Sequence, residues 1–349
     1  MDDVWAEDDT TPAAIEAALR RMFAQRHKEE RAYVPARVMN MVVVVEKEFR
    51  GEIENRLERV GRFHPSRLIL VLVEPGRQRL AANVRIGTDD APRAGAITVG
   101  RERVELFVGE RHVPKLDTLV DPLMVSDLAT MVWSPHRHIA AVDALRRLAQ
   151  IVLIDSLDAP DVETALARAD DLSRDTYVVD LAWLRSTPWR ERIAATFDSP
   201  RRRQELWRIS GVTVRHREDS LAAGLLYCGW LASRLGWEPG PLAQARGAWN
   251  GFAHTRRQDI RVTLQPVDQN APGLAGVTIE TDSGASVSLN RAPGGLCAVR
   301  RERDGTERSW IVMGASRGEG GILGEGVRQA LLRDPTYRPA LKSAEAMVV

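Results

Sequence analysis

The hydrophobic pattern divides the chain into two halves that differ in the order of their elements. In the first half, continuous β-branched and leucine-rich runs alternate with amphipathic segments, starting with a helix predicted from Pro12. Such runs are typical of strands that are covered on both faces. Buried strands are predicted at 38–45, 68–73 and 151–154. This half is therefore predicted to be an α/β domain with a mixed, mainly parallel sheet and helices on both faces.

The second half contains short strands separated by regular turn signals such as Asp282-Ser283-Gly284 and Asp304-Gly305. This spacing predicts an antiparallel meander, and the helix expected at 221–235 makes the domain α+β. The predicted divisions are an acidic disordered tail (1–11), an α/β N-terminal domain (12–182), an α+β C-terminal domain (183–335) and a C-terminal tail (336–349).

Composition and charge narrow the range of partners. The 349 residues carry a formal net charge of +1, which argues against nucleic acid as the main partner, because backbone neutralisation needs a sustained positive face. No apolar run approaches the roughly 18 residues of a membrane span, and the acidic N-terminus is unlike a signal peptide. Cys228 and Cys297 form neither a disulfide framework nor a metal spacing. We expect a cytoplasmic protein that binds neither membrane nor nucleic acid.

The segment 180–190 concentrates two tryptophans, two arginines, an acid and a Ser-Thr-Pro turn. One interpretation is a hinge between domains whose tryptophans fill the core, because Trp is highly buried on average. The other is a docking surface, since Trp and Arg often dominate protein interfaces. The candidate partner-binding residues are Trp133, Trp183, Arg185, Trp189 and Arg190.

Other polar positions suggest weaker hypotheses. A pocket at the sheet edge is predicted from Arg37, Asn40, His64 and Arg67. The arginines 201–203, 208, 215 and 217 form either a solvated face or a surface that grips an acidic patch on another protein. The loop 316–324 resembles a phosphate-binding loop only superficially, so a flexible turn is expected. No catalytic residue, metal site or cofactor is predicted; His136 and His138 lack the further ligands of a metal set.

Several stretches, in order along the chain, resemble the OpcA family of glucose-6-phosphate dehydrogenase assembly proteins. They are Ala36 to Val44, His64-Pro65-Ser66-Arg67, Pro122 to Trp133, Ile154-Asp155-Ser156, and Asp180 to Trp183 with Thr187-Pro188-Trp189-Arg190. Two stretches depart from the family pattern, Val125-Ser126-Asp127-Leu128-Ala129 and Trp133-Ser134.

The resemblance implies a non-catalytic partner that binds the oligomeric dehydrogenase and favours its active state, at the entrance to the oxidative pentose phosphate pathway. Some relatives are linked to thioredoxin control through cysteines. Because no matching cysteine pair is obvious here, no redox switch is expected. The alternative is an enzyme or sensor that binds a nucleotide or sugar phosphate at the ends of the strands at 38–45, 68–73 and 151–154.

Overall fold

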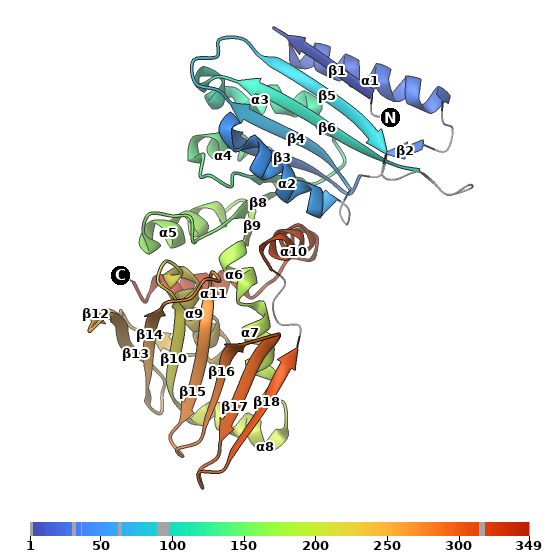
Figure 1. Cartoon of the computed structure of the whole chain (residues 1–349). Helices are drawn as coiled ribbons and strands as arrows, with labels where there is room; N and C mark the ends of the chain where they lie inside the picture. The colour runs from blue at the N-terminus through green and yellow to red at the C-terminus, as the bar shows by residue number, and fades with distance from the viewer. Residues whose placement is uncertain are drawn as a thin grey trace. The chain divides into compact units, whose positions relative to one another are not determined.

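The computed structural model describes residues 3–29, 33–35, 37–61, 65–88, 98–313 and 318–348, and it divides the chain into two compact units (Figure 1). The N-terminal unit comprises residues 1–154, 175–179 and 326–331. The C-terminal unit comprises residues 155–174, 180–325 and 332–349. Each unit is built on one nine-stranded sheet of the described residues.

The sheet of the N-terminal unit has the strand order β1-β5-β6-β4-β3-β7-β8-β9, with β2 paired to β6. Its neighbours β6, β4, β3, β7 and β8 run parallel, and β5 is antiparallel to both β1 and β6. The strands are β1 (Asp3–Asp8), β2 (Tyr33–Pro35), β3 (Met39–Glu46), β4 (Ser66–Val73), β5 (Ala81–Thr88), β6 (Thr98–Val108), β7 (Thr130–Trp133), β8 (Ile151–Ile154) and β9 (Tyr177–Asp180).

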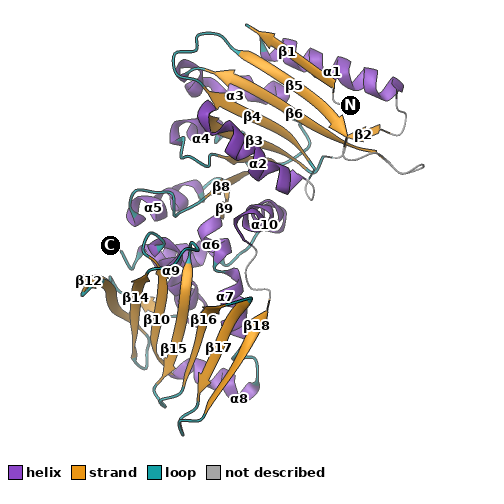
Figure 2. Cartoon of the chain, in the orientation of Figure 1, coloured by secondary structure: helices purple, strands orange, loops and turns teal. Residues whose placement is uncertain are grey.

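Helices cover this sheet, as the buried strands require. Seven of the eight residues of β3 are buried, and a strand without an exposed face needs packing on both sides. Figure 2 shows α2 in front of the sheet and α3 and α4 behind it. The helical segments are α1 (Pro12–Glu29), η1 (Lys47–Phe49), α2 (Arg50–Gly61), η2 (Glu110–Lys115), α3 (Leu116–Val120), η3 (Asp121–Leu123) and α4 (Ile139–Leu145). The predicted α/β class is confirmed.

The sheet of the C-terminal unit has the order β11-β13-β14-β10-β15-β16-β17-β18, with β12 paired to β13. Antiparallel pairs join its neighbours except β10 and β14, which run parallel. The predicted α+β domain with an antiparallel meander is confirmed. The strands are β10 (Ile209–Arg217), β11 (Glu238–Pro239), β12 (Ala243–Ala245), β13 (Ala248–His254), β14 (Asp259–Val267), β15 (Leu274–Thr281), β16 (Ser286–Ala292), β17 (Gly295–Arg301) and β18 (Glu307–Met313).

The core helix of this unit is α9 (Leu221–Leu235), which packs on β10 and β14 on one side and on α11 on the other. The helices α9 and α11 approach closely at Gly229, where an added Cβ would lie 2.1 Å from the carbonyl oxygen of Ala340. The other helical segments of the second half are α5 (Val162–Leu172), α6 (Leu181–Arg185), α7 (Thr187–Ala195), α8 (Pro200–Arg203), η4 (Gln204–Arg208), α10 (Gly318–Leu332) and α11 (Tyr337–Glu345).

Several predicted divisions differ from the structure. The acidic segment expected to be disordered forms β1, because its backbone pairs with β5 from Asp3 to Asp8. The expected tail 336–349 contains α11, which buries Tyr337 and Leu341. The expected loop 316–324 is helical from Gly318, and its first two residues lie outside the described part of the chain. The predicted domain boundary at 182/183 stays a prediction, although α5 groups with the C-terminal unit.

Candidate functional site

The 180–190 segment is built around Asp180, at the carboxyl end of β9. One carboxylate oxygen of Asp180 accepts hydrogen bonds from the amides of Ala182 (2.9 Å) and Ser156 (3.1 Å). The other accepts from the hydroxyls of Ser156 (2.5 Å) and Tyr337 (3.0 Å). Burial, together with the nearby charge of Asp155, raises the pKa of Asp180 to about 6. Asp180 therefore caps α6 and connects three distant parts of the C-terminal unit.

Trp183 and Arg190 form the second part of this network. The guanidinium of Arg190 lies over the Trp183 ring and donates to the Trp183 carbonyl, the Ser186 hydroxyl and the Thr187 hydroxyl. The indole nitrogen of Trp183 donates to Asp334 (2.9 Å). Burial lowers the pKa of Arg190 to about 9, an effect that the charge of Asp334 partly offsets. Trp183, Ser186 and Arg190 of this network are buried, while Thr187 and Asp334 are partly exposed.

Arg185 and Trp189 complete the segment. Arg185 makes a bidentate ion pair with Asp155, with nitrogen–oxygen distances of 2.8 and 2.7 Å. Trp189 is 2% exposed and lies below the guanidinium of Arg291, whose Cζ is 5.7 Å from the ring centroid. The structure thus gathers four of the five candidate partner-binding residues in one buried cluster, which supports the core interpretation of these tryptophans.

Trp133 lies apart from this cluster, on β7 of the N-terminal unit. It is 1% exposed, and the guanidinium of Arg56 lies 4.9 Å from its ring centroid. In the folded chain, the side chains of all five candidates are largely buried. Direct contact between these residues and a partner stays a prediction.

The predicted pocket residues Arg37 and Arg67 converge on Glu102, which is 3% exposed. Arg67 also donates to the Leu123 carbonyl (2.9 Å). Both arginines pair with this buried carboxylate, so loss of either one would leave the charge of Glu102 incompletely compensated. His64 lies outside the described residues. The predicted pocket of these four residues stays a prediction.

Asn40 has a structural task in the same unit. Its amide nitrogen donates to the carbonyls of Val125 (3.0 Å) and Leu128 (3.2 Å), and its oxygen accepts from the Val125 amide (2.9 Å). Asn40 therefore holds the segment 125–129, one of the two stretches that depart from the family pattern. A buried amide with three such partners has little capacity left for a ligand.

An exposed cationic surface lies on α8 and η4; we define it as the α8 basic surface, comprising Arg201, Arg202, Arg203 and Trp207. Trp207 is 63% exposed. Among the described residues, none of the three arginine side chains makes an ion pair or hydrogen bond; the pKa of Glu302 is lowered mainly by its hydrogen bond with Arg300 and further by the charges of Arg202 and Arg201. Nearby, Arg300 pairs with Glu205 (2.6 Å) and Glu302 (2.8 Å), so the carboxylates beside the surface are already bound to another arginine.

The remaining arginines of the predicted basic cluster are engaged within the protein. Arg208 pairs with Asp282 (2.7 Å), and Arg217 pairs with Asp219 (2.6 Å). Arg215 donates to Asn290 (2.8 Å), and burial lowers its pKa. Only the α8 portion of that cluster therefore presents free cationic groups to solvent.

Two residues important to these arrangements were not singled out from the sequence. Trp207 is exposed because it lies in the short α8–η4 segment, which buries no residue. Glu102 lies within β6, shortly before the apolar positions Val104 and Leu106. An acid inside a run with Val104 and Leu106 was the available signal, because charged groups in such strands need a partner.

The part of the chain that the structure describes contains no group of three or more metal-ligating side chains. His136 and His138 face separate carboxylates, Glu52 at 3.4 Å and Glu46 at 3.7 Å. In the same described ranges, no helix is both long and apolar enough to cross a bilayer.

Comparison with known proteins matches two family models along the chain. Residues 58–171 match the glucose-6-phosphate dehydrogenase subunit N-terminal domain, and residues 176–341 match the C-terminal domain of the same subunit. The chain belongs to the OpcA family. The matched regions contain the 180–190 segment and the α8 basic surface, so both are parts of the family domains.

Curated relatives agree with this assignment. The protein is similar to the "Putative OxPP cycle protein OpcA" of Synechococcus elongatus, with 32% identity over 50% of this chain and 41% of that protein. It is similar to the protein of the same name from Nostoc punctiforme, with 31% identity over 36% of this chain and 28% of that one. The chain spans less than half the length of these relatives.

Among solved structures, an oxidoreductase from Sinorhizobium meliloti is similar, with a TM-score of 0.48 and 12% sequence identity, over 88% of this chain and 95% of that chain. This distant likeness carries no functional conclusion.

Proposed function

We propose that this protein is a non-catalytic partner that binds oligomeric glucose-6-phosphate dehydrogenase and favours the active state of that enzyme. In this role it supports the oxidative pentose phosphate pathway from the cytoplasm. The observation that carries the proposal is membership of the OpcA family, whose two domain models describe a subunit of that dehydrogenase. The lack of a metal-ligating group in the described residues is compatible with this role but does not argue for it.

The α8 basic surface is the part of the molecule best suited to the contact. It combines three arginines, of which Arg201 and Arg203 are exposed and Arg202 is half-buried, with the exposed indole of Trp207, and these residue types often contribute most of the energy of an interface. Unpaired positive charges also accelerate association with an acidic partner surface. We therefore propose that the α8 basic surface binds an acidic patch of the dehydrogenase.

Activation by such a partner requires that its binding be thermodynamically coupled to the equilibrium between the inactive and active states of the dehydrogenase. A bound protein raises activity only if it binds the active state more tightly than the inactive state, and the ratio of the two affinities limits the effect. A tenfold shift in the equilibrium between states needs about 1.4 kcal/mol of differential binding.

The decisive experiment is a titration of the cognate dehydrogenase with this protein at subsaturating glucose 6-phosphate. We expect a saturable rise in rate, through a lower half-saturation or a higher maximal rate, no turnover by this protein alone, and co-elution of the two proteins. Unchanged kinetics together with separate elution would contradict the proposal.

A matched pair of variants locates the contact. Arg201→Ala with Arg203→Ala removes two exposed charges from the α8 basic surface, while Arg256→Ala with Arg257→Ala removes two exposed charges from the turn between β13 and β14. We expect the first pair alone to weaken activation and to reduce its dependence on salt. Equal effects of the two pairs would refute this location while leaving the activator role intact.

The sequence also left open a nucleotide- or sugar-phosphate-binding role for the N-terminal unit. One observation favours a ligand site there, a hollow at the ends of two of the three strands expected for it.

A further inference from the structure

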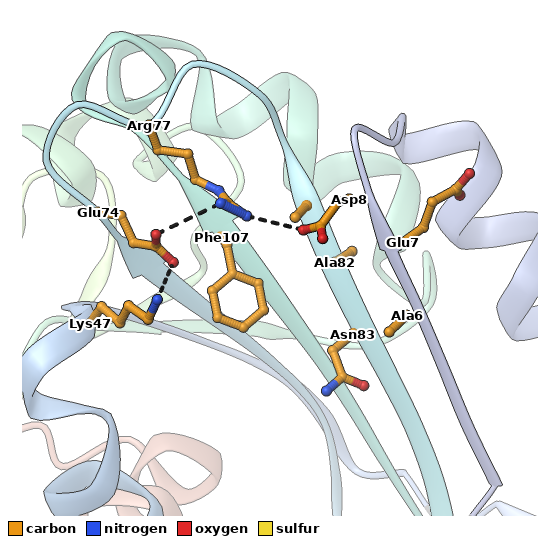
Figure 3. A pocket seen from close by; sticks show the side chains of 10 residues that line it. Ala6, Glu7, Asp8, Lys47, Glu74, Arg77, Ala82, Asn83 and Phe107 are labelled. Atoms are coloured by element: carbon orange, nitrogen blue, oxygen red, sulfur yellow. Dashed lines mark hydrogen bonds and ion pairs between the residues drawn. The ribbon is translucent and has the colours of Figure 1, made fainter.

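A hollow of about 420 Å³ lies in the N-terminal unit at the carboxyl ends of β3, β4 and β6 (Figure 3). Lys47 follows β3, Glu74 follows β4, and Phe107 lies near the end of β6. The hollow is outside the clusters described above. Ligands of open sheets with parallel strands commonly bind at this edge, and the volume is within the range of small-molecule sites.

Two cations, Lys47 and Arg77, line the hollow together with the carboxylates of Glu7, Asp8 and Glu74. Lys47 Nζ pairs with Glu74 at 3.1 Å, while Arg77 makes longer contacts with Glu74 (3.7 Å) and Asp8 (3.4 Å). Figure 3 shows these groups arranged around the opening. The Nε atom of Arg77 is buried and has no hydrogen-bond partner among the described residues. A phosphate that replaced Glu74 and Asp8 as the partner of these cations would make charge-assisted bonds of about 2.7–2.9 Å with both.

Phe107 supplies the apolar part of the hollow. Its ring lies between the two cations, with Lys47 Nζ 5.8 Å and Arg77 Cζ 5.7 Å from the centroid. The residue opposite Phe107 on β5 is Ala81, whose small side chain leaves room above the sheet. Beside the ring, the side-chain oxygen of Asn83 lacks a hydrogen-bond partner within the described ranges. A planar ring stacked on Phe107 would place its polar edge near this amide.

We propose that this hollow binds a phosphorylated small molecule that carries an aromatic ring and has the size of a mononucleotide. Lys47 and Arg77 bind the phosphate, Phe107 stacks on the ring, and Asn83 bonds to its edge. The site goes beyond the proposed function, because binding to the N-terminal unit does not require the dehydrogenase.

Calorimetric titration of the full-length chain tests the proposal, with AMP, adenosine, ribose 5-phosphate and inorganic phosphate as probes. We expect AMP to bind at least tenfold more tightly than each of the other three, because only AMP has both the ring and the phosphate. Absence of binding by AMP at millimolar concentration would overturn the proposal. So would equal affinity for AMP and inorganic phosphate, since the ring would then contribute nothing.

Variants separate the two halves of the site. Lys47→Gln and Arg77→Gln should each weaken AMP binding at least tenfold and leave adenosine binding unchanged, while Phe107→Leu should weaken AMP and leave inorganic phosphate unchanged. Lys115→Gln, which removes an exposed charge elsewhere in the same unit, is the matched control. Circular dichroism verifies that each variant is folded. If Lys47→Gln and Arg77→Gln bind AMP as tightly as Lys115→Gln does, the site is wrong.

Discussion

The guanidinium of Arg190 lies over the indole of Trp183, with Cζ 3.3 Å from the ring centroid. The planar guanidinium cation therefore lies against the face of the indole ring, which is the geometry of a cation–π interaction. Because both residues are buried, the stacked pair is shielded from water and salt. The pair therefore contributes to the rigidity of the segment that connects β9 with α7.

Replacement of Arg190 should destabilise the C-terminal unit. Arg190→Lys keeps the charge but loses the stacking and the fixed donors, so we expect a loss of about 2 kcal/mol in the free energy of unfolding. Arg190→Ala should cost about 3–5 kcal/mol, because it also opens a cavity beside Trp183. Chemical denaturation followed by tryptophan fluorescence measures both values. Arg234→Lys, on the exposed side of α9, should change little; equal midpoints for the two lysine variants would contradict the prediction.

The buried tryptophans show the limit of sequence reasoning about this site. Their type and spacing singled out the segment 180–190. Tryptophan is common both in protein interfaces and in hydrophobic cores, so the sequence alone could not separate the two interpretations. The choice depends on partners such as Asp334 and Tyr337, which follow about 150 residues later. No local pattern records such a contact.

The fold was more predictable than the site. The run Val42 to Val45 has no polar position, which suffices to indicate a strand covered on both faces. The prediction of a disordered tail was wrong for residues 3–8. Their acidic composition resembles that of a disordered segment, but their backbone pairs with β5. Edge pairing of this kind depends on main-chain hydrogen bonds, so side-chain polarity does not reveal it.

Trp207 provides a second test, which concerns binding rather than stability. Trp207→Ala should weaken binding to glucose-6-phosphate dehydrogenase at least tenfold and leave the melting temperature within about 1 °C, because the side chain is 63% exposed. Surface plasmon resonance and thermal melting measure the two effects.

Phe252→Ala is the control for Trp207→Ala, since Phe252 is 53% exposed on β13 of the same unit. Its removal should affect neither binding nor melting. Equal binding losses for the two variants would indicate a general effect of lost aromatic surface, and the assignment to the α8 basic surface would fail.

Asp180 should make stability depend on pH. Because burial raises its folded-state pKa to about 6 from 3.8, its contribution to stability is complete below pH 3.8 and is lost as the pH rises through 6. Asp180→Asn should therefore gain about 2–3 kcal/mol relative to the wild type between pH 4 and 7. Denaturation midpoints across this range measure the difference.

Ser156→Ala offers an independent check on the same group. It removes a hydrogen bond from the serine hydroxyl that lowers the pKa of Asp180 and keeps the carboxyl, so the pH at which stability falls should move upward. Parallel pH profiles for wild type, Asp180→Asn and Ser156→Ala would show that Asp180 does not titrate in this range.

Two glycines of α9 form a matched pair for the contact with α11. Gly229→Ala would place a Cβ 2.1 Å from the Ala340 carbonyl oxygen, whereas Gly224→Ala would meet only side chains, at 3.3 and 3.4 Å. Both changes raise helix propensity by about 1 kcal/mol. We expect Gly229→Ala to lower the free energy of unfolding by about 1–3 kcal/mol overall, because the rigid backbones of α9 and α11 must move apart. Gly224→Ala should be nearly neutral. Calorimetric melting distinguishes them, and similar melting temperatures would refute the close approach.

The division of the chain into interleaved units has a consequence for folding. The polypeptide passes between the units five times, at 154/155, 174/175, 179/180, 325/326 and 331/332. In the C-terminal unit, α11 (Tyr337–Glu345) packs on the core helix α9. During synthesis, the core of this unit therefore cannot be completed until the residues of α11 have left the ribosome.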